Sequence, residues 1–95
     1  MIISFGDGAT EDFFHSRSTK RAAKFKNFEG AARRRLDVLN AANSLADLAA
    51  SPGNRLEALK QNLNGYHSIR VNDQWRVIFV WENGNASSVE ITDYH

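Results

Sequence analysis

The second half of the chain alternates apolar with other residues at a period of two, which is typical of β-strands. Three segments there are rich in β-branched and aromatic side chains, namely residues 66–71, 74–82 and 86–94. Short polar gaps separate the segments, and Asn83-Gly84 in the second gap is a strong signal for a tight hairpin. The pattern predicts three antiparallel strands in a meander.

The middle strand is predicted to be central, because both of its faces carry apolar residues. One face presents Trp75, Val77, Phe79 and Trp81, and the other presents Arg76, Ile78, Val80 and Glu82. Arg76 therefore points away from the two tryptophans.

The first half of the chain has a helical period instead. Apolar residues recur at spacings of three and four, which stripes one face of a helix: Phe28, Ala32, Leu36, Leu39 and Ala42. Asn27 is a candidate N-cap of this helix, and Ser44 is a candidate cap of a second helix. Ser51-Pro52-Gly53 ends the second helix, so the pattern predicts two helices in antiparallel arrangement.

The N-terminal residues complete the predicted fold. Residues 2–5 are a short apolar run before Gly6-Asp7-Gly8, which predicts a short strand followed by a turn. Residues 9–17 predict one or two helical turns with Thr10 as N-cap and both Phe13 and Phe14 buried, and residues 18–27 predict a loop or a short helical turn. We expect an α+β fold in which the N-terminal strand and the meander form a small antiparallel sheet, covered by the helical hairpin.

Composition narrows the class of protein. Ninety-five residues, 42% of them hydrophobic, suit one domain over 1–95. The absence of cysteine excludes a disulfide framework and thiolate metal sites. The sequence has no apolar run of membrane-spanning length and its start lacks the features of a signal peptide, so we expect a cytoplasmic protein without a membrane partner.

The net charge of +1 is unevenly distributed. Between residues 17 and 35 the only acid is Glu29, and the bases are Arg17, Lys20, Arg21, Lys24, Lys26, Arg33, Arg34 and Arg35. Such a segment indicates either a polyanionic or acidic partner or a solvated helix face.

Proton-exchanging groups occupy the end of the last predicted strand. Asp93, Tyr94 and His95 follow one another there, and His suits general acid or base work near neutral pH. Strand alternation sends Tyr94 to one face and its two neighbours to the other. The alternative interpretation is a frayed tail without a function.

Basic groups precede this end in the sequence. Lys60, Arg70 and Arg76 are candidates to surround a phosphate and to stabilise the charge that grows on it during reaction. Their structural alternatives are a solvated Lys60 and an ion pair of Arg76 with Glu82, Glu90 or Asp93. His15 and His67 are isolated and no phosphate-binding glycine loop is present, so we expect neither metal nor cofactor.

In combination these motifs make the chain resemble the HigB-type toxins of the RelE/ParE superfamily, from bacterial type II toxin–antitoxin modules. The matching stretches span nearly the whole chain: "MIISF" before a short helix with paired Phe, the helical hairpin, "LNGYHSIRVNDQWRVIFVW" and the terminal "ITDYH". The resemblance implies a compact RelE-like fold and an mRNA interferase that cuts mRNA in the ribosomal A site. It also implies two partners, the 70S ribosome with its mRNA and a HigA-like helix-turn-helix antitoxin, through which alone the complex would contact operator DNA.

The resemblance also implies roles for residues that match the family's motifs. Asp93, Tyr94 and His95 match a catalytic C-terminal cluster, and Lys60 matches a catalytic, positively charged residue in the loop before the meander. Arg76 in "QWR" matches a phosphate-contacting arginine, and Arg70 occupies a common family position. The basic segment with Arg33, Arg34 and Arg35 is expected to meet the phosphates of ribosomal RNA.

The chain departs from some toxins of the family at one position. Those carry a catalytic His three residues before the loop lysine, whereas this chain has Glu57 there. A carboxylate accepts protons but repels phosphate, so the sequence places more weight on the C-terminal groups, with His95 or Asp93 exchanging the proton. ParE-like inhibition of DNA gyrase and a non-catalytic RNA- or protein-binding module are the alternative functions.

Overall fold

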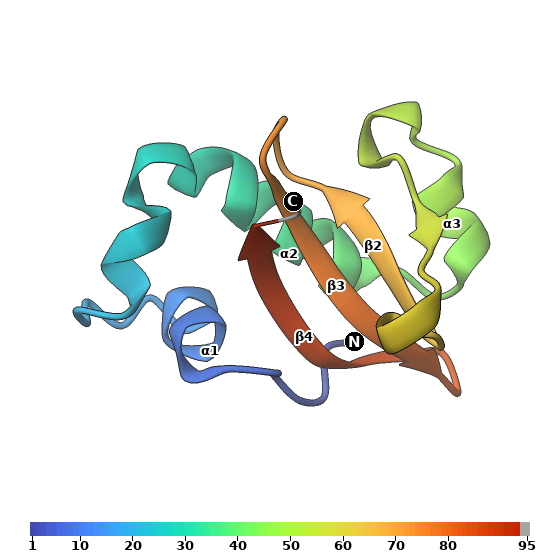
Figure 1. Ribbon diagram of the computed structural model, residues 1–95, viewed down its shortest axis with the longest axis horizontal. Helices are drawn as coiled ribbons and strands as arrows, with labels where there is room; N and C mark the ends of the chain where they lie inside the picture. Colours follow the sequence, from blue (N-terminus) through green and yellow to red (C-terminus); the bar gives the residue numbers. More distant parts are fainter. Residues whose placement is uncertain (94–95) are drawn as a thin grey trace.

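The computed structural model describes residues 1–93 of the chain. Helices come first and strands second, and α2 passes behind the sheet as Figure 1 is drawn. The helical elements are α1 (Gly8–Phe14), the 3₁₀ helix η1 (Ala22–Phe28), α2 (Glu29–Ala41), α3 (Leu45–Ala49), η2 (Pro52–Asn54) and η3 (Gln61–Leu63). The strands are β1 (Glu57–Ala58), β2 (Tyr66–Arg70), β3 (Trp75–Glu82) and β4 (Asn85–Asp93). The predicted α+β architecture is confirmed.

The sheet is a four-stranded antiparallel meander in the order β1-β2-β3-β4. The three predicted strands are β2, β3 and β4, and β3 lies between the other two as expected. Asn83 and Gly84 have φ values of 52° and 78°, which is the left-handed geometry of a two-residue hairpin turn. The two-residue edge strand β1 was not predicted, because the sequence around it indicates a loop.

The N-terminal segment joins the sheet, as predicted, but it runs parallel to β4. Bridges at Ile2–Ala86 and Phe5–Val89 hold it there, and the Ile3 amide donates to the Ala86 carbonyl at 2.8 Å. The expectation that this segment is an antiparallel strand is therefore wrong. Two isolated bridges replace a regular ladder, because the register of β4 shifts opposite Ile78–Val80.

Two predicted helix caps are corrected by the structure. Asp7, not Thr10, caps α1, and its Oδ1 accepts a hydrogen bond from the Thr10 amide at 2.9 Å. The Thr10 hydroxyl is instead buried and accepts from the Ile91 amide at 3.0 Å, which joins α1 to β4. Asn27 lies inside η1, which continues directly into α2. The predicted cap at Ser44 is confirmed by a capping box with Asp47.

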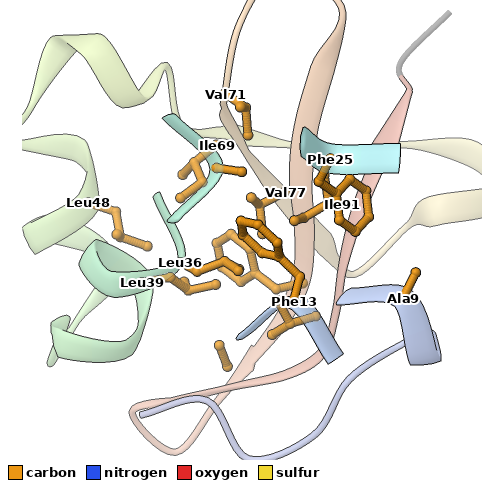
Figure 2. Packing of buried hydrophobic residues seen from close by; sticks show 14 of the residues in the cluster. Ala9, Phe13, Phe25, Leu36, Leu39, Leu48, Ile69, Val71, Val77 and Ile91 are labelled. Atoms are coloured by element: carbon orange, nitrogen blue, oxygen red, sulfur yellow. The ribbon is translucent and has the colours of Figure 1, made fainter. Parts of the chain in front are cut away.

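The hydrophobic core lies between the helices and one face of the sheet (Figure 2). Figure 2 shows side chains of α1, η1 and α2 converging on those of β2, β3 and β4. The members of the core include Phe13, Phe25, Leu36, Leu39, Ile69, Val77, Phe79 and Ile91. At one end of the core, the Trp75 ring stacks on Phe28 with centroids 5.0 Å apart. One face of the sheet is thus fully used for packing, which leaves the other face for chemistry.

The loop after α1 is held by a buried carboxylate. Asp12 is only 2% exposed and accepts hydrogen bonds from Thr19 at 2.9 Å, Arg21 at 2.5 Å and Arg17 at 3.2 Å. The hydrogen bond from Arg21, followed by that from Thr19, lowers the pKa of Asp12 well below the usual range of an aspartate. This network fixes the path of the chain from α1 to η1.

Replacing Asp12 with Asn should destabilise the fold at neutral pH and weaken its response to acid. Because the folded-state pKa is lowered, Asp12 contributes stability above the usual aspartate pKa and loses it as pH falls below that value. The difference in denaturant midpoint between the wild type and Asp12→Asn should therefore be large at pH 7 and smaller at pH 3. Asp37→Asn, an exposed carboxylate on α2, is the matched control. An equal difference at both pH values would contradict the role of this ion-pair network.

Candidate active site

The sheet face turned away from α2, which faces the viewer in Figure 1, is here called the open face. Paired residues on neighbouring strands point to the same side of a sheet, so the register assigns the members of this face. They include Glu57 from β1, Tyr66, Ser68 and Arg70 from β2, Arg76, Ile78, Val80 and Glu82 from β3, and Ser87, Glu90 and Thr92 from β4. Most of these side chains are polar or charged, in contrast to the packed face.

Arg76 is the best-positioned cation of the open face. Its side chain is 15% exposed, one guanidinium nitrogen donates to the Ser68 hydroxyl at 3.0 Å, and another donates to Glu57 Oε1 at 2.9 Å. The edge strand β1 brings Glu57 there, because Glu57 pairs with Ser68. The side chain of Glu57 is 50% exposed, so this carboxylate remains accessible to a ligand.

A second arginine stands directly beside Arg76. Arg70 and Arg76 are Cα partners on β2 and β3, and Arg70 forms an ion pair with Asp73 in the turn between those strands. Like charges directly opposite each other destabilise a sheet unless anions compensate them. Arg70 is paired with Asp73 and Arg76 with Glu57, and both of these carboxylate side chains are exposed, so an incoming phosphate can compete with them for the guanidinium groups.

Asp93 lies at the same end of the sheet as these arginines. It pairs with Trp75, next to the Arg76–Thr92 pair, and its Oδ2 accepts from the Gln74 side chain at 2.8 Å. Strand alternation places it on the face of Trp75, at the exposed edge, and not on that of Arg76. Tyr94 and His95, the other two predicted C-terminal groups, lie outside the residues that the structure describes.

Lys60 is placed towards the other end of the sheet. The amide of its neighbour Leu59 donates to the Tyr66 carbonyl at 2.8 Å. The Lys60 backbone therefore lies near the first residue of β2. At about 3.3 Å per residue, the start of β2 is about 13 Å from Arg70 at its end. The structure therefore brings Arg70 and Arg76 together but does not bring the Lys60 backbone beside them.

Glu90 is a carboxylate that could carry a proton, although the sequence alone indicates only a possible ion pair with Arg76. It lies on the open face two residues before Thr92, and burial, followed by the nearby charge of Asp7, raises its pKa. The Gly6 backbone approaches so closely that a Cβ there would lie 2.8 Å from Glu90 Oε1. The alternation of β4 could have placed Glu90 on this face, but its burial depends on the N-terminal segment.

The three consecutive arginines of α2 do not form one exposed basic face. Arg33 donates to the Phe13 carbonyl at 2.8 Å and lies over the Phe13 ring, 4.6 Å from its centroid. Arg35 donates to the Arg70 carbonyl and to Asn54 Oδ1, both at 2.8 Å, and to the Gly53 carbonyl at 3.3 Å. Of the three, only Arg34 is exposed, and the other two are half-buried. The guanidinium of Arg35 joins α2 to β2 and η2, which favours a structural role over the expected contact with RNA.

Arg35→Ala should therefore destabilise the fold by about 2 kcal/mol, since it leaves the buried Asn54 and the Arg70 carbonyl without a donor. Arg34→Ala is the matched control, and its effect on the free energy of unfolding should stay within about 0.5 kcal/mol. Denaturant unfolding followed by circular dichroism measures both. Equal stability of the two variants would return Arg35 to the set of RNA-binding candidates.

Two kinds of site are not found in the part of the chain that the structure describes. Residues 1–93 contain no group of three or more His, Cys, Asp or Glu side chains arranged to hold a metal ion. No helix within the same range is long and apolar enough to cross a bilayer.

Comparison with known proteins identifies the family. Residues 3–95 match the family model of HigB-like toxins, described as RelE-like toxins of type II toxin–antitoxin system HigB. The toxin HigB-1 of Vibrio cholerae is 42% identical over 86 residues, which cover 90% of each chain. An uncharacterised protein of Haemophilus influenzae is 39% identical over 56 residues, 59% of this chain and 55% of that protein.

Solved structures agree on the fold. A YoeB chain from a YoeB–YefM toxin–antitoxin complex of Staphylococcus aureus aligns over all of this chain and 95% of its own, with a TM-score of 0.59 and 21% identity. A YoeB/ParE toxin from Agrobacterium tumefaciens aligns over both full chains with a TM-score of 0.57 and 13% identity. With the family model matching nearly the whole sequence, the chain belongs to the HigB-like family of RelE-like toxins of type II toxin–antitoxin systems.

Proposed function

We propose that this toxin is a ribosome-dependent mRNA interferase, an endoribonuclease that cuts mRNA in the ribosomal A site and so arrests translation. The observation that carries the proposal is the contact of Arg76 with Glu57 beside Arg70 on the open face. It combines a fixed guanidinium, which can bind a phosphodiester, with an accessible carboxylate, which can accept a proton. An inhibitor that acts only by binding gyrase needs no such combination.

The chemistry requires no metal. The ribose 2′-OH attacks the adjacent phosphorus, a new P–O bond forms to the 2′ oxygen, and the bond to the 5′ oxygen of the next nucleotide breaks. A base removes the 2′-OH proton and an acid protonates the leaving 5′ oxygen. Arg76, with Arg70 beside it, would stabilise the negative charge that accumulates on the phosphate oxygens in the transition state.

Glu57 is the candidate base that the geometry favours. From the sequence alone, Glu57 carries less weight than the C-terminal groups, because a carboxylate accepts protons but repels phosphate. Its contact with Arg76 offsets that repulsion, and a phosphate that takes over the guanidinium would release Glu57 Oε1 beside the reacting ribose. The sequence alone does not indicate this role for Glu57, because Arg76, which offsets the repulsion of phosphate, lies nineteen positions away in the chain.

The remaining predicted residues take supporting roles in the proposal. His95 would protonate the leaving oxygen and Tyr94 would orient the RNA. Asp93, on the face of Trp75, would orient His95 and would not exchange the proton itself. Lys60 lies near the start of β2, which is about 13 Å from Arg70 at the end of that strand. It would contact the RNA at a distance from the cleavage point. Ribosomal contacts align the substrate, which a site with so few groups does not do alone.

The proposal includes two partners and a cellular location. Arg33 and Arg34 belong to a basic segment that would attract the phosphates of ribosomal RNA without reading sequence. A HigA-like helix-turn-helix antitoxin would neutralise the toxin and carry the complex to operator DNA. Both partners place the toxin in the cytoplasm.

Primer extension on a defined mRNA, with purified toxin and with or without 70S ribosomes, tests the proposal. We expect new 5′ ends within codons only when ribosomes are present. Cleavage of naked mRNA at the same rate would exclude the ribosome dependence. Intact mRNA under all conditions, together with loss of gyrase supercoiling, would favour the ParE-like alternative, and intact mRNA with salt-sensitive RNA binding would favour a non-catalytic module.

A further inference from the structure

A cavity of about 480 Å³ lies on the helical side of the molecule, away from the open face. Its walls come from the end of α1, the loop that follows, η1 and α2, which lie beside one another in Figure 1. The lining residues are Phe13, Ser16, Arg17, Ser18, Thr19, Ala22, Ala23, Lys26, Glu29 and Arg33. None of the groups proposed for RNA cleavage belongs to this set.

The cavity carries excess positive charge. Arg17, Lys26 and Arg33 line it together with one acid, Glu29. Arg17 shares the buried Asp12 with Arg21, and Arg33 is bonded to a carbonyl, so neither cation is fully neutralised. Within residues 1–93, no carboxylate forms an ion pair with Lys26. An acidic group is therefore the complementary ligand.

Part of the lining is apolar and consists of Phe13, Ala22 and Ala23, and this part is here called the floor. It is not a platform for a nucleobase, because the Arg33 guanidinium already covers the Phe13 ring at 4.6 Å and Phe25 packs against it with centroids 5.5 Å apart. An aliphatic side chain fits such a floor beside Ala23 better than a stacked base does.

The walls are fixed before any ligand binds. The Thr19 hydroxyl donates to Asp12 at 2.9 Å and accepts from the Ala22 amide at 3.2 Å, so one side chain ties the loop both to α1 and to the start of η1. Arg33 is held in the same way by the Phe13 carbonyl. Preorganised walls lower the entropic cost of binding.

We propose that this cavity is a docking site for an acidic peptide segment of a partner protein, with one aliphatic side chain on the floor and flanking carboxylates on Lys26, Arg17 and Arg33. For a toxin of this family, the antitoxin is the protein partner whose segment would take this place. The site lies outside the open face and covers part of the basic segment. Occupation would therefore mask cations that attract ribosomal RNA without blocking the groups that cut mRNA. The inference rests on the antitoxin partner of the proposed function, but it does not depend on RNA cleavage.

Binding of the antitoxin encoded beside the toxin gene, measured by isothermal titration with full-length toxin, tests the proposal. Lys26→Glu should weaken binding about tenfold or more, because it replaces an attractive charge with a repulsive one. Lys20→Glu makes the same charge change on the same segment, outside the cavity lining, and should leave affinity within about threefold. Ala23→Phe fills the floor at an exposed position without changing charge, and it should also weaken binding.

Three outcomes would overturn the docking site. Unchanged affinity in both Lys26→Glu and Ala23→Phe would show that the antitoxin binds elsewhere. Equal losses in Lys26→Glu and Lys20→Glu would show attraction to the basic segment as a whole. Loss of ribosome cosedimentation in Lys26→Glu, with antitoxin affinity intact, would assign the cavity to RNA. Failure of the wild type to cleave mRNA would instead reject the proposed function and leave the docking result standing.

Discussion

Replacing Arg76 with Ala should reduce ribosome-dependent mRNA cleavage by roughly 100-fold or more, the usual effect of removing a preorganised donor to transition-state charge. The hydrogen bond to Ser68 holds this guanidinium on the open face after phosphate has replaced Glu57, so the donor is in place before charge develops. Arg70 beside it retains part of the positive field. Initial cleavage rates by primer extension on programmed 70S ribosomes measure the effect.

Two further variants separate charge from geometry. Arg76→Lys keeps the charge but loses the planar fork that can keep its hydrogen bond to Ser68 while a phosphate oxygen replaces Glu57, so it should recover only part of the rate. Arg55→Ala removes an exposed arginine that lies outside the open face, and it should leave the rate unchanged. A rate for Arg76→Ala within threefold of the wild type, with the thermal melting curve intact, would exclude Arg76 from the reaction.

Glu57→Gln then distinguishes a base from a mere partner of Arg76. Glutamine keeps an oxygen that can accept from the guanidinium, but it cannot accept the 2′-OH proton. If Glu57 is the base, cleavage falls while ribosome binding remains. If Glu57 only holds Arg76, the variant cleaves normally or faster, because the arginine is more easily released to phosphate.

The meander was predictable because its information is local. The alternation of β3 and the left-handed turn at Asn83-Gly84 each depend on a few neighbouring residues, and both agree with the structure. The sheet then placed Arg70 opposite Arg76 without further assumptions, because a short turn fixes the register of two strands. This part of the candidate site was within reach of the sequence.

Long-range contacts decide what the sequence did not reveal. Asp7 and Thr10 are both suitable caps, and the choice between them follows from the contact of the Thr10 hydroxyl with Ile91. In the sequence, Arg35 cannot be distinguished from Arg33 and Arg34. Its structural role follows from the hydrogen bond that it donates to Asn54. Glu57 becomes a candidate base only because the two-residue edge strand β1 places it beside Arg76. In each case the deciding partner is far away in the chain.

Deleting Tyr94 and His95 should abolish both mRNA cleavage and growth arrest while the protein still folds. The core drawn in Figure 2 is built from residues that precede Asp93, and β4 pairs with β3 through Asp93 itself. We therefore expect a circular dichroism spectrum and a melting temperature close to those of the wild type. The loss of activity follows from the proposal that His95 exchanges the leaving-group proton and Tyr94 orients the RNA.

Point variants identify which of the two residues matters. His95→Ala removes a proton donor, so the pH dependence of cleavage near neutrality should change along with the rate. Tyr94→Phe keeps the ring that would contact RNA and loses only the hydroxyl, so it should reduce the rate less than Tyr94→Ala does. If the truncated protein still cleaves mRNA and arrests growth at the wild-type level, the reaction belongs to Glu57, Glu90 and the arginines of the open face alone.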